Sequence, residues 1–441
     1  MRVLFLTFMM VVWLTGIFPA QGQTAPMLIR AAIAQNQHSV EVTVPEGAAF
    51  QVDGRKAALP VRPKQTRVIL AAESSGFLFN STHIGASTLM FQAPENGTIE
   101  INRKLYRGAV LIQHAPNGAS FHVINVLPLE QYLCGVVPQE MPASWPTEAL
   151  KAQAIAARSF ALALREQNRQ NSYDVPVGGQ AYGGYAAEQV ATNQAVNETA
   201  GIVLTYNGEC IPGYYYSASG GYTESSEVVW GTEKPYLQAV SDVETKSPLE
   251  KWEKLFTPEE LDQRLAEAGF SIGKLESIQL SVLKKTPVNE NDRGVSGRVK
   301  QVRFIGVTGE INVEGNRLRQ LLQLPSTLFD ISIVNKTPKV IETTITDGYG
   351  IPVLEKKIPV TVGDQVVTPL LSDAQKQLRR ISRGPGIQVR FSGRGFGHGV
   401  GMSQWGAKTI AEAAKPEEKD VYKNILFKYY QGVTLFKAYE E

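Results

Sequence analysis

The sequence is poor in cysteine and histidine, which argues against several kinds of scaffold and site. It contains two cysteines, Cys134 and Cys210, and five histidines. Two cysteines cannot build a disulfide scaffold. They could pair in an oxidising compartment, or they could equally be two buried small side chains. No two histidines lie three or four positions apart, so we predict neither a metal site nor a cofactor.

Long runs of one charge and long internal apolar stretches are also missing. Lysine and arginine together number 44 against 42 aspartates and glutamates, a formal net charge of +2. No basic run is longer than a pair such as Arg379-Arg380, so we predict no nucleic-acid partner. Beyond the N-terminal segment, no apolar run reaches the length of roughly 20 residues that a membrane span needs.

Residues 1–22 have the pattern of an export signal. Arg2 supplies a positive charge, Val3–Phe18 is almost wholly apolar, and Pro19–Gly22 supplies small residues at the spacing of a cleavage site. A retained membrane anchor is the alternative, but the apolar run is shorter than the roughly 20 residues of a typical span. We therefore predict a signal peptide and an exported protein of the periplasm or the cell wall.

The rest of the chain mixes strand-like and helix-like patterns. Residues 23–120 alternate short Val-, Ile-, Thr- and Phe-rich runs with Gly, Pro and Asn, which predicts a β-rich N-terminal region. Pro146–Arg165 has helical periodicity with apolar residues on most faces, so we expect a buried helix. Gly201–Tyr206 and Cys210–Ser217 should be two strands on either side of a turn at Asn207-Gly208. Further helices are expected at Thr257–Ala268, Asn316–Leu322, Ser372–Arg380 and Val421–Tyr430, and strands within Val299–Val313 and at Ile387–Phe391. This order has no βαβα rhythm and predicts an α+β fold.

The segment at residues 127–158 is the richest in groups that could carry chemistry. Glu140 follows an apolar run and precedes a Met-Pro pair. A carboxyl group in apolar surroundings has a raised pKa, as a general acid near neutral pH needs. Lys151 and Arg158 would share a helix face, from which they could hold an anionic or polyhydroxyl substrate. Alternatively, Glu140 caps the following helix and the two cations cover the surface with their aliphatic stems.

The segment Tyr214–Thr223 combines aromatic rings with small hydroxyl side chains. Tyr216, Ser217 and Ser219 suit a sugar groove, because rings stack on sugar faces and hydroxyls bond to sugar hydroxyls. Alternatively, the segment is a strand that ends in a Gly-Gly turn with half-buried tyrosines. The serines do not fall in a G-x-S-x-G elbow, which disfavours a serine nucleophile.

A third segment, Gly393–Ala407, is rich in glycine. Glycine at every second position from 393 to 401 lets the backbone approach a ligand closely. The pattern is not G-x-G-x-x-G, so a dinucleotide site has no support. His398 is flanked by glycines and is expected to be reachable.

Together these segments resemble the SpoIID/LytB family, named for the stage II sporulation protein D and the amidase enhancer LytB. The resemblance extends from about Val123 to Phe436, with insertions near 245–300 and 340–385, so residues 121–441 are predicted to form the catalytic domain. The segments that carry it are Leu129–Val137, Glu140–Pro142, Trp145-Pro146, Glu148–Ala154, Ala157-Arg158, Ser219–Gly221, Val229–Gly231, Gly397–Gln404 and Tyr429–Val433.

The resemblance implies a lytic transglycosylase that acts on the glycan strands of cell-wall peptidoglycan after an amidase has removed their stem peptides. The glutamate of the family's Glu-Met-Pro motif is its catalytic acid and corresponds to Glu140. Some relatives can hold zinc through Cys and His residues in the segment that corresponds to Tyr173–Tyr182, which here contains neither. The expected substrate-binding residues, around a glycan-binding groove, are Lys151, Arg158, Gln180, Tyr182, Tyr216, Ser217, Ser219, His398 and Gln404.

The expected reaction needs one protein carboxyl group. Glu140 would protonate the glycosidic oxygen between N-acetylmuramic acid and N-acetylglucosamine, and the 6-hydroxyl of the substrate would close onto the anomeric carbon to give a 1,6-anhydro end. Glycoside hydrolases usually use two carboxylates, and only one strong candidate is visible. The rival hypothesis is a non-catalytic wall-binding module that recruits or stimulates an N-acetylmuramoyl-L-alanine amidase.

Overall fold

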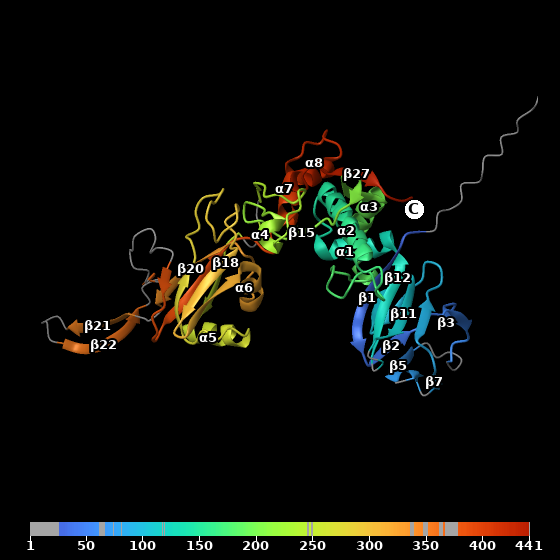
Figure 1. Cartoon of the computed structure of the whole chain (residues 1–441), viewed down its shortest axis with the longest axis horizontal. Coiled ribbons are helices and arrows are strands. Elements are labelled where there is room, and N and C mark those ends of the chain that lie inside the picture. Colours follow the sequence, from blue (N-terminus) through green and yellow to red (C-terminus); the bar gives the residue numbers. More distant parts are fainter. Residues whose placement is uncertain are drawn as a thin grey trace, which may run out of the picture.

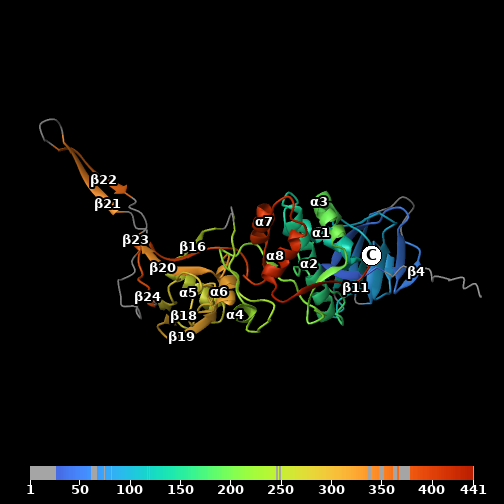
Figure 2. The ribbon, with the colours of Figure 1, turned by 90° about the horizontal axis from the view of Figure 1, so that it is seen from above.

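The computed structural model combines helices with mainly antiparallel sheets, which confirms the predicted α+β class. The residues it describes are 26–440 except 61–66, 74, 81, 117, 119, 245, 246, 248, 249, 336–338, 347–351, 361–364 and 367–377. The predicted signal peptide lies outside them. Among the described residues, none of the helices combines the length and the apolar character that crossing a bilayer requires. Figures 1 and 2 show a β-rich region at one end, a helical middle part, and a second β-rich lobe at the other end.

The N-terminal region consists of two six-stranded sheets. The first has the order β1 (Leu28–Gln37), β12 (Phe121–Pro128), β11 (Ala109–His114), β8 (Thr88–Gln92), β3 (Ala49–Val52), β4 (Arg55–Ala57). The second has the order β10 (Lys104–Tyr106), β9 (Ile99–Ile101), β2 (Ser39–Thr43), β5 (Arg67–Glu73), β6 (Gly76–Phe79), β7 (Thr82–Ile84). Phe50 and Phe91 of the first sheet pack against Phe79 of the second. A shared aromatic core therefore holds this region together.

The middle part is built around the long helix α2 (Thr147–Gln167), which is buried as predicted. Its alanines let other helices approach closely; these are α1 (Leu129–Glu140), α3 (Val190–Glu198), α7 (Gln404–Ala413) and α8 (Val421–Tyr429). A short helix α4 (Ser226–Trp230) and a one-turn helix η1 (Tyr185–Ala187) lie in the connections. Cys134 is buried in α1 and Cys210 is exposed, and no disulfide joins them.

A three-stranded sheet closes this middle part. It has the order β14 (Glu209–Cys210), β13 (Ile202–Tyr206), β27 (Thr434–Lys437). The predicted hairpin at Asn207-Gly208 is confirmed, and both turn residues have positive φ, 52° and 84°, as a tight hairpin turn of this type needs. Its second strand is shorter than the expected Cys210–Ser217, because only Glu209 and Cys210 pair with β13. Two short strands, β15 (Tyr215–Tyr216) and β26 (Met402–Ser403), pair in parallel nearby.

The second lobe has its own core, formed mainly by two four-stranded sheets and two helices. One sheet has the order β16 (Trp252–Phe256), β25 (Ile387–Gly393), β20 (Phe329–Asn335), β23 (Gln365–Val366). The other has the order β19 (Gly309–Glu314), β18 (Gln301–Gly306), β17 (Leu275–Gln279), β24 (Leu378–Arg380). The helices are α5 (Pro258–Glu267) and α6 (Gly315–Leu322), and a separate hairpin joins β21 (Lys339–Thr346) to β22 (Pro352–Val360).

Most elements expected in this lobe and beyond it are present, but one expectation is wrong. A helix was expected at Ser372–Arg380, but residues 378–380 form the strand β24. Residues 372–377 lie outside the described ones. The physical reason is tertiary. Arg379 is buried and donates hydrogen bonds to the carbonyl of Leu280 and to the carboxylate of Asp330, at 2.6 and 2.7 Å, which fix the segment against β17 and β20.

Candidate functional site

Glu140 is the last residue of α1, and its half-buried carboxylate faces neutral hydrogen-bond donors. The backbone N–H of Ala181 donates to Glu140 Oε1 at 3.2 Å. The side chains of Tyr215 and Gln404 also hydrogen-bond to this carboxylate. These donors come from the loop before η1, from β15 and from the first residue of α7, so four separate segments meet at one carboxyl group.

The surroundings of Glu140 raise its pKa. Burial disfavours the charged carboxylate and is the main cause, while the hydrogen bonds from Ala181, Tyr215 and Gln404 favour it and limit the shift. The position at the end of α1 acts in the same direction as burial, because the free carbonyl groups there carry partial negative charge. Glu140 therefore keeps its proton to a higher pH than an exposed glutamate, as a general acid should.

Two buried glutamines hold these donors in place. Gln180 accepts a hydrogen bond from the hydroxyl of Tyr132 at 3.2 Å, and its amide nitrogen lies 3.1 Å from the hydroxyl of Tyr215. The amide of Gln404 lies 3.4 Å from Gln153 Oε1 on α2. Of the predicted binding residues, Gln180 and Gln404 thus belong to the network around Glu140.

The parallel pairing of β15 with β26 brings the second and third sequence segments together. Tyr215 pairs with Met402, and Tyr216 with Ser403. Tyr216 is buried, and its ring centroid lies 5.3 Å from that of His398. Burial, and then the nearby guanidinium of Arg298, lower the pKa of His398, so the imidazole is neutral at neutral pH. Its Nδ1 accepts a hydrogen bond from the backbone N–H of Val400 at 3.1 Å, which fixes the ring.

The two serines of the second segment mainly hold loops. Ser219 is fully buried; its hydroxyl accepts a bond from the N–H of Gly221 at 3.0 Å. Its own backbone N–H donates to Glu244. The carbonyl of Ser217 accepts a bond from the N–H of Trp405 at 3.0 Å. Both serines therefore bond to other parts of the protein.

Tyr182 joins the N-terminal region to α1. Its hydroxyl donates to Asn125 Oδ1 at 2.7 Å, and its ring lies between those of Tyr106 and Tyr132, with centroid distances of 6.0 and 4.7 Å. Gly135 is needed opposite this ring, since a Cβ there would lie 2.6 Å from it. The position of Tyr182 supports packing between these two parts.

Arg158 does not face a ligand, which corrects the prediction that it binds substrate. It is fully buried, with its Nε and Nη2 atoms 2.8 and 2.6 Å from the two carboxylate oxygens of Glu130. Lys151 lies 2.8 Å from Glu198 and 3.1 Å from Glu148. The two cations do share one side of α2, but α3 covers much of that side, which spacing alone could not reveal.

Two acidic residues that no sequence motif indicated lie beside the β15–β26 pair. Glu244 accepts a hydrogen bond from Ser403 Oγ at 2.7 Å and one from the N–H of Gly220 at 3.2 Å. Asp242 accepts a bond from the hydroxyl of Tyr429 at 2.7 Å, and burial raises its pKa. They lie in a loop without a recognisable motif, so only the three-dimensional arrangement identifies them.

The described residues contain no group of three or more His, Cys, Asp or Glu side chains that could hold a metal ion. In the Tyr173–Tyr182 segment, Asp174 is paired with Arg30 at 2.7 Å. The carboxylate of Asp174 is therefore already engaged in an ion pair.

The segment that contains Glu140 is similar to known proteins. Residues 117–206, which contain Glu140 and Gln180, match the family model described as Stage II sporulation protein. The chain is 33% identical over 354 residues to the amidase enhancer of Bacillus subtilis, covering 78% of this chain and 46% of that protein. It therefore spans less than half of the length of that relative.

Two further relatives are covered over most of their length. The stage II sporulation protein D of Bacillus subtilis is 29% identical over 338 residues, or 71% of this chain and 76% of that protein. An uncharacterised protein of Brachyspira hyodysenteriae is 26% identical over 371 residues, or 83% of this chain and 82% of that protein. The family match and the named relatives support the assignment of the chain to the SpoIID/LytB family.

Proposed function

We propose that the protein is an exported lytic transglycosylase of the periplasm or cell wall. It would cleave the bond between N-acetylmuramic acid and N-acetylglucosamine in peptide-stripped glycan strands. The observation that carries this proposal is the position of Glu140, a half-buried carboxyl group that meets uncharged donors and whose pKa is raised by burial. The names of the relatives, an amidase enhancer and a sporulation protein, support a role at the cell wall.

In the first step, protonated Glu140 donates its proton to the glycosidic oxygen as that bond breaks. Positive charge develops at the anomeric carbon, and Glu140 becomes a carboxylate. The N–H of Ala181 and the side chains of Tyr215 and Gln404 already point at this carboxylate and stabilise the new charge without reorganisation.

In the second step, the 6-hydroxyl of the same sugar attacks the anomeric carbon and passes its proton to Glu140. The ring closes to a 1,6-anhydro end, and the enzyme regains its acid. No water is consumed, so no second carboxylate is needed to activate one.

The two neighbouring carboxylates have roles of their own in the fold. Glu244 receives hydrogen bonds from Ser403 and from the N–H groups of Ser219 and Gly220, and Asp242 receives one from Tyr429. Hydrogen bonds within the protein thus already occupy oxygens of both carboxylates. We assign these two residues to holding the loops around β15 and β26.

The rival proposal, a non-catalytic module that stimulates a cell-wall amidase, is favoured by one observation. The B. subtilis relative is named an amidase enhancer. Under this proposal the same surface would bind glycan and bring an amidase to it, and Glu140 would help to hold the strand.

Digestion of purified, peptide-free glycan separates the two proposals. The products are analysed by mass spectrometry, with and without prior amidase treatment of the wall. The transglycosylase proposal predicts fragments with 1,6-anhydro ends. Reducing ends would mean that water was the acceptor. Intact strands, together with a higher activity of an added amidase, would favour the enhancer.

A further inference from the structure

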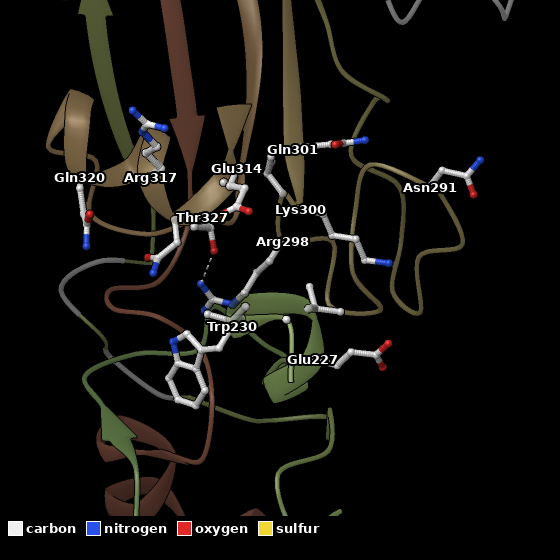
Figure 3. Close-up of a pocket in the computed structure, with 16 residues that line it drawn as sticks. Glu227, Trp230, Asn291, Arg298, Lys300, Gln301, Glu314, Arg317, Gln320 and Thr327 are labelled. Atoms are coloured by element: carbon white, nitrogen blue, oxygen red, sulfur yellow. Dashed lines mark hydrogen bonds between the residues drawn. The ribbon is translucent and has the colours of Figure 1, made fainter. Parts of the chain in front are cut away.

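A polar cavity of about 850 Å³ lies between the helical middle part and the second lobe. Figure 3 shows it between α4, which contributes Trp230, and the β18–β19–α6 side of the lobe. Glu140 does not line this cavity. Its volume is in the usual range for a ligand pocket.

The cavity is lined by groups that bind sugars in proteins. Trp230 offers part of an aromatic ring, and Asn316, Glu227 and Glu314 offer planar amide and carboxylate groups that can pair with hydroxyl and acetamido groups. The side-chain oxygen of Asn316 is buried and has no hydrogen-bond donor among the described residues. Such an orphaned acceptor is expected to find a partner in a ligand or water.

Three cationic side chains, Arg298, Lys300 and Arg317, line the cavity together with the two carboxylates Glu227 and Glu314. The guanidinium of Arg298 is fully buried, and its hydrogen-bond acceptors are uncharged: the carbonyls of Ser219 and Gly397 and the hydroxyl of Thr327. Its Nε has no acceptor among the described residues. Lys300 lines the same cavity, and no ion pair is found for its ammonium group within the described part of the chain. Two cationic groups without a directly bonded carboxylate attract an anion.

The cavity is connected to the Glu140 network through packed aromatic rings. The ring of Trp230 lies 4.6 Å from that of Tyr214 and 5.4 Å from that of His398. Tyr214 directly precedes Tyr215, which hydrogen-bonds to Glu140. One wall of the cavity is therefore packed, through these rings, against the segment that supplies a donor to Glu140.

We propose that this cavity is a subsite for a carboxylate-bearing sugar of the strand, with Trp230 as the stacking platform and Lys300 as the residue that selects the carboxylate. The inference rests on the proposed function, because it takes the ligand to be a glycan strand. A muramic sugar has a free lactyl carboxylate only when its stem peptide has been removed. Lys300 would thus distinguish a stripped strand from one whose lactyl group is in amide linkage.

Binding of two matched oligosaccharides by the Glu140→Gln protein tests this subsite. One is a peptide-free glycan tetrasaccharide, and the other is the same compound with its lactyl carboxylates methyl-esterified. Calorimetry should give roughly 10-fold tighter binding of the acid, the size of one charged hydrogen bond. Adding Lys300→Gln should weaken binding of the acid by a similar factor and leave the ester unaffected.

Lys254→Gln, an exposed lysine of β16 in the same lobe and outside the cavity lining, is the matched control and should bind both compounds like its parent. Equal affinities for acid and ester, or an acid affinity that Lys300→Gln does not change, would overturn the subsite. The proposed function is judged separately, by cleavage of the acid by the wild-type chain. Cleavage without a Lys300 effect removes the subsite alone, and a Lys300 effect without cleavage removes the transglycosylase alone.

Discussion

Two glutamates at opposite ends of α1 have opposite surroundings. Glu130, in the first turn, is buried and paired with Arg158, and it also accepts bonds from the N–H of Gly201 and the hydroxyl of Tyr439. Glu140, in the last turn, meets uncharged donors. A helix favours a negative charge at its start and disfavours one at its end. The same side chain thus serves as a fixed anion at one end and as a proton donor at the other.

The largest expected effect comes from removing the proton donor, Glu140, at the end of α1. Glu140→Gln keeps the size of the side chain but removes the proton, and a general acid contributes roughly 10²–10⁴-fold to a rate. Cleavage of peptide-free glycan, measured by the release of soluble fragments, should fall by at least about 100-fold. Glu148→Gln, in the first turn of α2, is the control and should cleave nearly normally. Full activity of Glu140→Gln would remove the mechanism.

Removing the ion pair of Glu130 at the other end of α1 should lower the stability of the protein. Arg158→Met leaves the charge of Glu130 buried without its partner, and loss of one member of a buried pair lowers the free energy of unfolding by roughly 3–5 kcal/mol. Denaturant titration of the purified protein measures this loss. The double variant Glu130→Leu, Arg158→Met should recover part of it. A soluble, fully stable Arg158→Met with weak glycan binding would instead restore Arg158 as a ligand-binding residue.

The pH dependence sharpens the contrast. Because the pKa of Glu140 is raised above its usual 4.5, kcat/KM should fall about tenfold per unit as the pH rises above this raised value. Stability follows the same sign: the protonated form is favoured by the fold, so the free energy of unfolding decreases as the pH rises from 4.5 through the raised pKa. Glu140→Gln should abolish this part of the slope. An unchanged slope would assign it to another group, such as Asp242.

The smallest effect concerns Lys151. Its two carboxylate partners are partly exposed, at 26% and 40%, so Lys151→Ala should lower the free energy of unfolding by only about 0.3–1 kcal/mol. Glycan cleavage by the folded variant should stay close to that of the wild type. A drop above about tenfold in cleavage with normal stability would support a substrate contact and the expectation drawn from the sequence.

Local patterns predicted what depends on neighbours in sequence. The buried helix α2 and the hairpin at Asn207-Gly208 both follow from residues within a few positions of each other. Spacing also placed Lys151 and Arg158 on one helix face, but it could not show that α3 covers that face.

Other parts of the site depend on long-range contacts. The donors to Glu140 include Gln404, far along the chain, and the lining of the cavity includes Arg298 from the second lobe. The acidic pair Asp242 and Glu244 lies in a loop without a motif. Such residues become recognisable only once the fold has brought them together.

The parallel pairing of β15 with β26 has a consequence for the order of folding. Residues 215–216 can pair only after residues 402–403 have been synthesised, and the whole second lobe lies between these two segments in the sequence. Contacts between such distant segments form late, since closing a long loop is entropically unfavourable until the intervening chain is compact. Gln404 follows directly after this pair, so Glu140 receives its complete set of donors only after the lobe has folded. A nascent chain that stops before β26 would have α1 and its glutamate but lack this donor.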